Sequence, residues 1–189
     1  MKKKIIITGG LGYIGTELCK LYSGVSWHHK ITVIDNRFIS ERVSQLRNWN
    51  IDFVHGDILD KNLIQKHLRD ADVVHHLAGV TAVPRTQSES SKEIDDNIKL
   101  VGVEGTQNIL DVISDNCKII FPSTHVVYEG IDKVKTDIKE EEITKPILAY
   151  SSSKAENEKQ LKNSKKNYII LRLGSAYGYS TDSMRIDIM

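Results

Sequence analysis

Residues 5–15 read Ile-Ile-Ile-Thr-Gly-Gly-Leu-Gly-Tyr-Ile-Gly. The β-branched run predicts a buried strand, the glycines predict a tight turn, and the apolar spacing that follows predicts a helix over 13–22. The amino end of a helix after such a turn binds anions, because its backbone N–H groups and its dipole favour negative charge. Gly9, Gly12 and Gly15 are spaced G-x-x-G-x-x-G, not G-x-G-x-x-G as in the commonest dinucleotide fingerprint. The stretch therefore predicts a strand–turn–helix unit that holds a pyrophosphate.

The next predicted strand distinguishes such a site from a mere tight connection. Residues 30–35 end in Asp35, about 20 residues after Gly15, where dinucleotide-binding folds place an acid. An acidic side chain there accepts hydrogen bonds from the adenosine ribose and repels a 2′-phosphate. Arg37 is the counter-argument, since an arginine just past this strand can hold that phosphate. With Asp35 in front of it, the sequence favours NAD over NADP as the cofactor.

The composition limits the classes of partner. The 189 residues, 40% of them hydrophobic, suffice for one sizeable core. A formal net charge of +1 gives no support for nucleic-acid binding. The apolar run after Lys4 is too short for a signal peptide or a membrane span, so no membrane partner is expected. Cys19 and Cys117 lie on different predicted elements, which indicates reduced thiols in a cytoplasmic protein.

Strand and helix patterns alternate along the chain. Helices are predicted over 40–49 (with Ser40 as N-cap), 59–68, 92–114 and from about 149, and strands over 30–35, 51–54, 72–79, 118–121 and 168–173. Such alternation implies right-handed crossovers and a parallel sheet covered on both faces. We therefore expect an α/β fold with a Rossmann-type doubly wound parallel sheet.

His75 and His76 are adjacent residues of one predicted strand, and they could suggest a metal site. Adjacent strand residues point to opposite faces of the sheet, so the two imidazoles cannot ligate one ion without distortion. We expect packing or hydrogen bonding for both side chains, and we predict no metal site.

Tyr150 and Lys154 form a second informative pair. Positions i and i+4 share one face of a helix, so the phenol and the ammonium can converge. A free phenol, with a pKa of about 10, is a poor base, and a nearby lysine favours the phenolate. The same lysine could reach the nicotinamide ribose. Ser123 and Thr124 end the preceding strand, the edge at which ligands bind in open α/β sheets.

Together these motifs resemble the extended short-chain dehydrogenase/reductase superfamily, and within it the NAD-dependent epimerase/dehydratase family that acts on nucleotide sugars. The resemblance covers nearly the whole chain. It rests on residues 8–15, Asp35-Asn36, Gly56-Asp57-Ile58, His76-Leu77-Ala78-Gly79, Ser123-Thr124 before Val127-Tyr128, Tyr150 with Lys154, and Leu171-Arg172.

The resemblance implies roles for individual residues. Thr124 would be the catalytic hydroxyl, Tyr150 the acid/base and Lys154 its activator. Asp57 and Ile58 would bracket the adenine. The full set implied to contact NAD is Gly9, Gly12, Tyr13, Ile14, Gly15, Asp35, Asn36, Asp57, Ile58, Leu77, Ala78, Gly79, Ser123, Tyr150 and Lys154. The set implied to contact substrate is Thr81, Arg85, Thr124 and Ser175.

The two residues after Thr124 discriminate among the reactions of the family. Sugar dehydratases carry Asp-Glu there, and sugar-acid decarboxylases keep an acid at the second position, whereas this chain has His125 and Val126. Valine cannot transfer a proton, so epimerisation is favoured, with C4 of a UDP- or GDP-sugar as the preferred centre. Alternatives are a nucleotide-sugar dehydrogenase or reductase, and a non-catalytic dinucleotide sensor. His125 is assigned to packing in preference to auxiliary acid/base chemistry.

Departures from the family pattern concern the substrate side. Gly102 replaces an asparagine of the long helix, and the loop after Tyr128 reads Glu129-Gly130 in place of glycine directly. By resemblance, residues 1–174 form the NAD-binding domain with the catalytic residues, and residues 175–189 begin a substrate-binding lobe that this chain largely lacks. The resemblance also implies a homodimer formed through the long helix and the helix of Tyr150.

Overall fold

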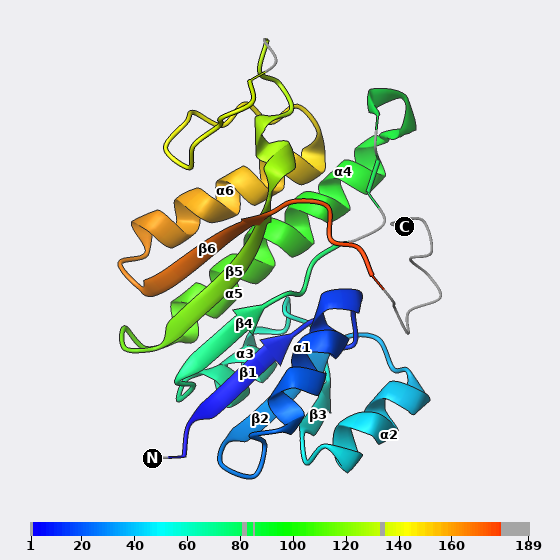
Figure 1. Cartoon of the computed structure of the whole chain (residues 1–189), viewed down its shortest axis with the longest axis vertical. Helices are drawn as coiled ribbons and strands as arrows, with labels where there is room; N and C mark the ends of the chain where they lie inside the picture. The colour runs from blue at the N-terminus through cyan, green and yellow to red at the C-terminus, as the bar shows by residue number, and fades with distance from the viewer. Residues whose placement is uncertain (1, 81–82, 85, 133–134, 179–189) are drawn as a thin grey trace.

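The computed structural model describes residues 2–80, 83–84, 86–132 and 135–178. One parallel sheet, in the order β3-β2-β1-β4-β5-β6, runs through it (Figure 1). This order is that of dinucleotide-binding folds and confirms the predicted Rossmann-type doubly wound sheet. The strands are β1 (Lys4–Thr8), β2 (Lys30–Asp35), β3 (Asp52–His55), β4 (Val73–His76), β5 (Lys118–Thr124) and β6 (Asn167–Leu173).

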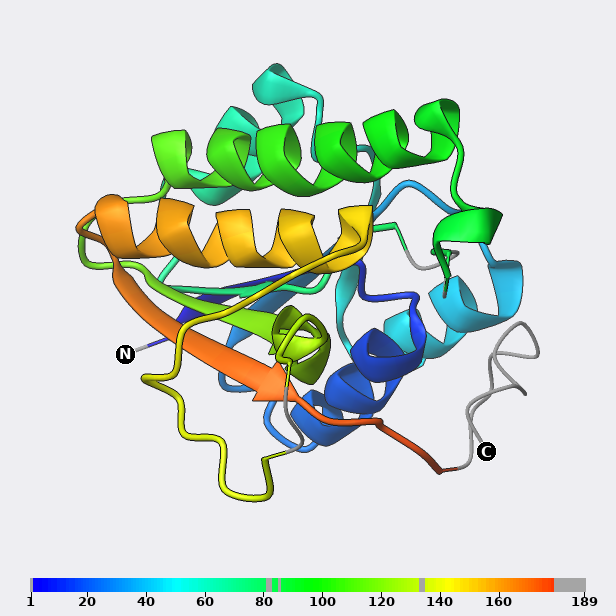
Figure 2. The ribbon, with the colours of Figure 1, turned by 90° about the horizontal axis from the view of Figure 1, so that it is seen from above.

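Helices cover both faces of the sheet, as Figure 2 shows from above. The α-helices are α1 (Tyr13–Ser23), α2 (Ser40–Asn48), α3 (Lys61–Leu68), α4 (Lys92–Lys99), α5 (Gly105–Val112) and α6 (Ala149–Asn163). Helices α1 and α2 close one core, and α3, α5 and α6 close the other. Among the described residues, no helix has the length and apolar character needed to cross a membrane.

The central strand β1 explains why the two cores form. Ile5 and Ile7 are buried in the core under α1 and α2, whereas Ile6 is buried in the opposite core. Alternate residues of a strand point to opposite faces, and a parallel strand between two helical layers is apolar on both. Burying each such side chain stabilises the fold by roughly 1.5–3 kcal/mol.

The long helix predicted over 92–114 is confirmed in place, but it contains a π-helical turn. Helices α4 and α5 are joined by η2 (Leu100–Glu104), a π-helix that includes Gly102. A Cβ at Gly102 would lie 2.1 Å from the Ser153 Oγ, so with glycine here that hydroxyl can keep its place between the two helices. The Gly102 carbonyl also accepts a hydrogen bond from the Asn157 side chain at 3.0 Å. The π-helical turn is thus in direct contact with α6, through Ser153 and Asn157.

Some local expectations differ from the structure. The helix predicted over 59–68 begins only at Lys61, with Asp60 as its N-cap. Ser40 is the first residue of α2, and the N-cap is Ile39, so the predicted Ser40 cap is wrong. Strand β5 continues past the predicted end to Thr124, although it contains Pro122. Proline is tolerated there because the pairing of β5 with β4 already ends at Ile120.

Candidate cofactor site and active site

The glycine turn between β1 and α1 is packed against the end of β4. Gly9 has a φ of +70°, and a Cβ there would lie 2.7 Å from the backbone nitrogen of Ala78. A Cβ at Gly15 would lie 2.5 Å from the Gly9 carbonyl oxygen. Gly12 is the N-cap of α1 and provides no side-chain cap. Because the first N–H groups of a helix require acceptors, this end of α1 suits a phosphate group.

Asp35 ends β2 beside this turn and is almost fully buried. Its Oδ2 accepts a hydrogen bond from the Leu11 N–H at 2.9 Å, and its Oδ1 accepts one from the Arg37 N–H at 3.0 Å. Arg37 Nε also lies 3.5 Å from Oδ1. An ionised carboxylate has about four acceptor positions, so Asp35 can hold the turn and still accept from a ribose hydroxyl.

Asn36 and Asp57 meet at the carboxyl edge of the sheet. The Asn36 side-chain amide donates to Asp57 Oδ2 at 3.0 Å, and the Leu59 N–H donates to Asp57 Oδ1 at 2.9 Å. The neighbouring Ile58 is buried in the core, and its carbonyl accepts from the Asn108 side chain at 3.1 Å. Asp57 is thus the member of the predicted adenine pair that has side-chain atoms at the edge.

The segment after β4 lies against the start of the glycine turn. Leu77 N–H donates to the Thr8 carbonyl at 3.1 Å, and Ala78 N–H donates to the Thr8 hydroxyl at 3.3 Å. A Cβ at Gly79 would meet no described atom within 4 Å. The predicted contacts Leu77 and Ala78 are therefore brought beside Gly9, and Gly79 follows them in the chain.

Tyr13 and Ile14 begin α1 at the same place. The Tyr13 hydroxyl donates to the Gly178 carbonyl at 3.1 Å, so the segment after β6 passes near the amino end of α1 (Figure 1). The Ile14 side chain is partly exposed. Both residues thus lie where the predicted pyrophosphate would bind.

The predicted substrate contacts are described only in part. Ser175 follows β6 and is exposed. Thr81 and Arg85 lie outside the described residues. The substrate side of the site therefore rests on Ser175 and Thr124.

The two hydroxyls that end β5 differ in their partners. Ser123 is buried and donates to Glu158 Oε1 at 2.6 Å. Thr124 is half-buried, and its Oγ1 accepts from the Val126 N–H at 3.3 Å, which caps the short 3-10 helix η3 (His125–Tyr128). Ser123 stays a predicted cofactor contact, but its hydroxyl is engaged by Glu158.

Lys154 lies one helical turn after Tyr150, on the side of α6 that faces β5. Its Nζ donates to the Pro122 carbonyl at 2.9 Å. The same atom is 4.4 Å from the ring centroid of Phe121 and 5.9 Å from that of Tyr150. Burial lowers the pKa of Lys154 to about 8. The ammonium group thus lies near the ring of the tyrosine that it is predicted to activate.

Tyr150 is the second residue of α6, and the start of α6 lies beside η3. Since Thr124 caps η3, the threonine and the tyrosine come to the same edge of the sheet. Lys154 is held near that edge by its hydrogen bond to the carbonyl oxygen of Pro122, which belongs to β5. The structure therefore brings the three predicted catalytic residues into one region at the end of β5.

The paired histidines are hydrogen-bonded on opposite faces of the sheet, as predicted. His76 lies between the hydroxyls of Thr8, at 2.9 Å, and Thr106, at 3.0 Å. Burial, with a smaller effect of the Lys154 charge, lowers the pKa of His76 to about 3. His75 Nε2 is 2.7 Å from the Tyr22 hydroxyl. Both imidazoles are thus held by hydroxyl groups.

Two charged residues near the site were not predicted from the sequence. Glu129 bonds to the chain just before α6, and Glu158 bonds to Ser123 and Arg172. Glu158 follows Lys154 at helical spacing, which could have indicated a side chain on the same face of α6. No local pattern indicates the contacts of Glu129, because its partners lie 18 or more residues away.

Fold and site together define a dinucleotide-binding α/β protein with a tyrosine–lysine pair at the carboxyl edge of its sheet. The model of the NAD dependent epimerase/dehydratase family matches residues 5–188. The chain belongs to this family, whose cofactor is NAD. The glycine turn and the carboxylate of Asp35 fit that cofactor. A Cβ at Gly12 would lie only 3.2 Å from the Gly9 carbonyl oxygen, so glycine keeps the turn tight at the amino end of α1, where a pyrophosphate would bind. Asp35 holds the same turn through the Leu11 N–H.

Known relatives differ in the reaction that they catalyse. The chain is 35% identical to a UDP-N-acetyl-alpha-D-glucosaminuronate decarboxylase of Bacillus cytotoxicus over 68% of this chain and 38% of that protein. It is 31% identical to a UDP-glucose 4-epimerase of Lactobacillus helveticus over 95% of this chain and 53% of that protein. The chain thus spans about half the length, or less, of these curated relatives.

Solved structures of enzymes with bound NAD have the same fold as this chain. The crystal structure of UDP-glucose 4-epimerase from Brucella ovis in complex with NAD has a TM-score of 0.77 to this chain and is 28% identical to it. The match covers 95% of this chain and 54% of that one. Relatives with different reactions thus share this half of the molecule.

Proposed function

We propose that this chain is the NAD-binding and acid/base part of a nucleotide-sugar epimerase. The observation that carries the proposal is the Lys154 ammonium, held by the Pro122 carbonyl and close to the Tyr150 ring at the edge where Thr124 ends β5. The activity is proposed for the full-length protein, because the chain spans about half of its relatives. A UDP- or GDP-sugar is the proposed substrate.

The proposed mechanism assigns each side chain one task. Tyr150 takes the proton from a sugar hydroxyl, with C4 as the favoured carbon, and Thr124 hydrogen-bonds the same oxygen. Lys154 stabilises the phenolate and reaches the nicotinamide ribose. NAD, when bound along residues 9–15, supplies the hydride chemistry at that carbon. The keto sugar then rotates in the site and is reduced on its other face. Tyr150 returns the proton to the same sugar oxygen.

The residues after Thr124 support epimerisation over the other reactions of the family. His125 Nδ1 is 3.2 Å from the Leu173 carbonyl, and Val126 is apolar. Neither position supplies the acid that a dehydratase or a decarboxylase requires there. In this proposal His125 has a structural role.

The decisive experiment incubates the full-length protein with a panel of UDP- and GDP-sugars. Formation of the epimer without net consumption of NAD supports the proposal. Stoichiometric reduction of NAD identifies a dehydrogenase instead. NAD binding without either reaction identifies a sensor.

Tyr150→Phe in the full-length protein tests the catalytic assignment. We expect turnover to fall by about 10²- to 10⁴-fold, because the phenol is the acid/base group. NAD affinity, measured by calorimetry, should stay within about twofold. Turnover equal to that of the wild type would contradict the assignment.

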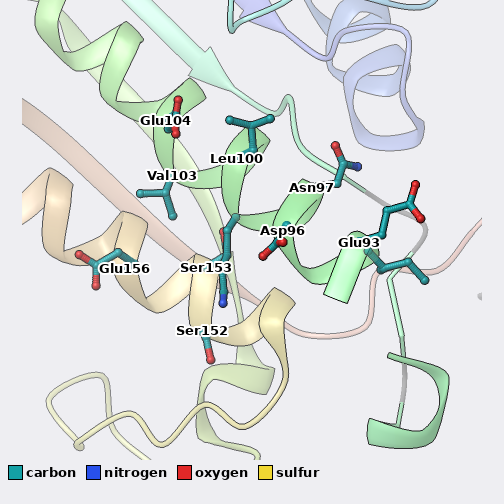
Figure 3. Close-up of a pocket in the computed structure, with 11 residues that line it drawn as sticks. Glu93, Asp96, Asn97, Leu100, Val103, Glu104, Ser152, Ser153 and Glu156 are labelled. Carbon is teal, nitrogen blue, oxygen red and sulfur yellow. The ribbon is translucent and has the colours of Figure 1, made fainter. Parts of the chain in front are cut away.

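We further propose a homodimer formed through α4 and α6. A hollow of about 1020 Å³ lies between α4 with η2 and the start of α6, and Figure 3 shows the side chains that line it. Ile94 and Leu100 are partly exposed there. A second copy would cover these apolar side chains, and light scattering of the full-length protein measures the mass that tests this.

We also propose a cytoplasmic protein. Cys19 and Cys117 are both buried and free. Burial raises the pKa of Cys19 to about 12 and that of Cys117 to about 11, so neither thiol is a nucleophile at neutral pH. Cell fractionation with an antibody against the protein tests the location.

A further inference from the structure

The amino end of α6, which carries Tyr150, has no cap of its own. Its N-cap is Leu148, in an extended conformation, and the leucine side chain has no oxygen with which to accept a backbone N–H. Tyr150 follows two residues later. Any displacement of this helix end therefore moves the phenol directly.

Glu129, which follows η3, bonds to the residues just before this helix end from a distant part of the chain. Its Oε1 accepts from the Ile147 N–H at 2.7 Å and from the Leu148 N–H at 2.8 Å. The buried hydroxyl of Ser151 is within hydrogen-bond distance of the same oxygen, and it lies 2.9 Å from the Leu148 carbonyl oxygen, a second acceptor for its one proton. One carboxylate thus binds the two residues before α6 and a residue in its first turn.

The charge of this carboxylate is stabilised where it stands. Burial acts to raise the pKa of Glu129, but the hydrogen bonds from Ser151, Leu148 and Ile147 outweigh that effect, and the pKa is lowered. The group is therefore ionised at neutral pH, and hydrogen bonds to an ionised acceptor are stronger than neutral ones.

The backbone around Glu129 reinforces the connection. The Lys145 N–H donates to the Val127 carbonyl at 2.8 Å, and the Gly130 N–H donates to the Lys145 carbonyl at 2.8 Å. A Cβ at Gly130 would lie 2.6 Å from that carbonyl oxygen, so glycine permits the close approach. The segment from η3 to Gly130 is thus fixed to the segment that leads into α6.

We propose that Glu129 is a positioning residue for the acid/base pair, because it joins η3, which Thr124 caps, to the helix end that carries Tyr150. The carboxylate sets the separation between the threonine hydroxyl and the phenol. This inference rests on the proposed function, since it concerns the geometry of the same two catalytic groups.

The test compares Glu129→Ala and Glu129→Gln in the full-length protein with bound NAD. We expect Glu129→Ala to lower kcat by about 10- to 100-fold, because a displacement of about 1 Å at a reacting group can cost a hundredfold. The KM and the NAD affinity should stay within about twofold. Glu129→Gln keeps an acceptor oxygen and should recover most of the lost kcat.

Glu142→Ala is the matched control. Glu142 belongs to the same loop and makes an ion pair with Lys135 at 3.1 Å, with both side chains well exposed. The same change of residue type there should leave kcat unchanged. Ser151→Ala is a second variant, in case Glu129→Ala does not fold. It removes one donor to the carboxylate and should lower kcat about three- to tenfold.

A kcat equal to that of the wild type in whichever of Glu129→Ala and Ser151→Ala folds overturns the proposal. So does a parallel loss of NAD affinity, which would indicate general loosening. Tyr150→Phe is measured alongside. If Tyr150→Phe retains turnover, the proposed function itself fails. If it loses turnover while Glu129→Ala does not, only the positioning role fails.

Discussion

At the scale of single residues, Gly15 has almost no space around it. A side-chain carbon there would lie 2.5 Å from the Gly9 carbonyl oxygen and 2.6 Å from the Gly10 Cα. Both atoms belong to the backbone of the turn, which Asp35 holds through the Leu11 N–H. The turn cannot yield to a larger residue without losing that contact.

Gly15→Ala should therefore destabilise the protein. The clash should exceed the roughly 1 kcal/mol that alanine gains in helix propensity, and we expect a net loss of about 2 kcal/mol in the free energy of unfolding. Denaturant titration measures it. At Gly24 a Cβ would lie 3.8 Å from the nearest atom, the Leu21 carbonyl oxygen, so Gly24→Ala should change stability by less than about 0.5 kcal/mol. Equal effects at the two glycines would contradict this account.

The sequence predicts some residues of the site and not others, for a physical reason. Gly9 and Asp35 could be predicted because spacing along a strand–turn–helix unit fixes where they lie. The contact of Asp35 with Leu11 was not predicted, since it depends on how the turn folds back. The contacts of Glu129 join segments 18 and more residues apart, and no local pattern encodes them.

At the scale of elements, α6 is the helix that carries the proposed acid/base pair. Tyr150, Lys154 and Glu158 follow one another at intervals of four residues, so all three lie on one side of the helix. Glu158 is buried and accepts from Arg172 Nη2 at 2.6 Å and from Ser123 at 2.6 Å. This ionic contact fixes α6 against β5 and β6.

Glu158→Ala should be strongly destabilising. It leaves the largely buried Arg172 without its carboxylate, and breaking a buried pair costs about 3–5 kcal/mol. Thermal and denaturant unfolding measure the loss. Glu156→Ala on the same helix removes only an exposed pair with Lys159, so we expect less than about 0.5 kcal/mol there. A similar cost for both variants would show that the buried pair adds nothing.

Helices and strands could be predicted where the apolar periodicity of the local sequence determines their type and position. The strands around β1 and the helix of Tyr150 were placed correctly because apolar spacing and turn residues agree. The π turn at Leu100–Glu104 was not predicted. Its Gly102 lies against Ser153 of α6, and apolar spacing along the long helix does not encode such a tertiary contact.

At the scale of the molecule, buried imidazoles link stability to pH. Burial lowers the pKa of His76 from 6.5 to about 3, and it also lowers the pKa of His75. Above pH 6.5 both states hold a neutral His76, so it contributes no pH dependence. Below pH 6.5 the unfolded chain binds a proton that the folded protein does not, and stability falls as the pH falls.

We therefore expect the free energy of unfolding to decrease between pH 6.5 and 5. The slope due to His76 should approach about 1.4 kcal/mol per pH unit toward the acid end of this window. His76→Gln should remove that part of the slope, and chemical denaturation at several pH values measures it. The pKa of carboxylates such as Glu158 is lowered in the folded protein, so the stability that they contribute is lost only below about pH 4.5.

The position of β1 in the sheet has a consequence during protein synthesis. Its neighbours are β2 and β4, and Thr8 pairs with His76, 68 residues later. At roughly 5–20 residues per second, several seconds separate the emergence of the two strands from the ribosome. Throughout that interval Ile5, Ile6 and Ile7 lack one of their two flanking strands. Slow translation should therefore increase aggregation of the nascent chain, and chaperones that shelter apolar segments should raise its yield.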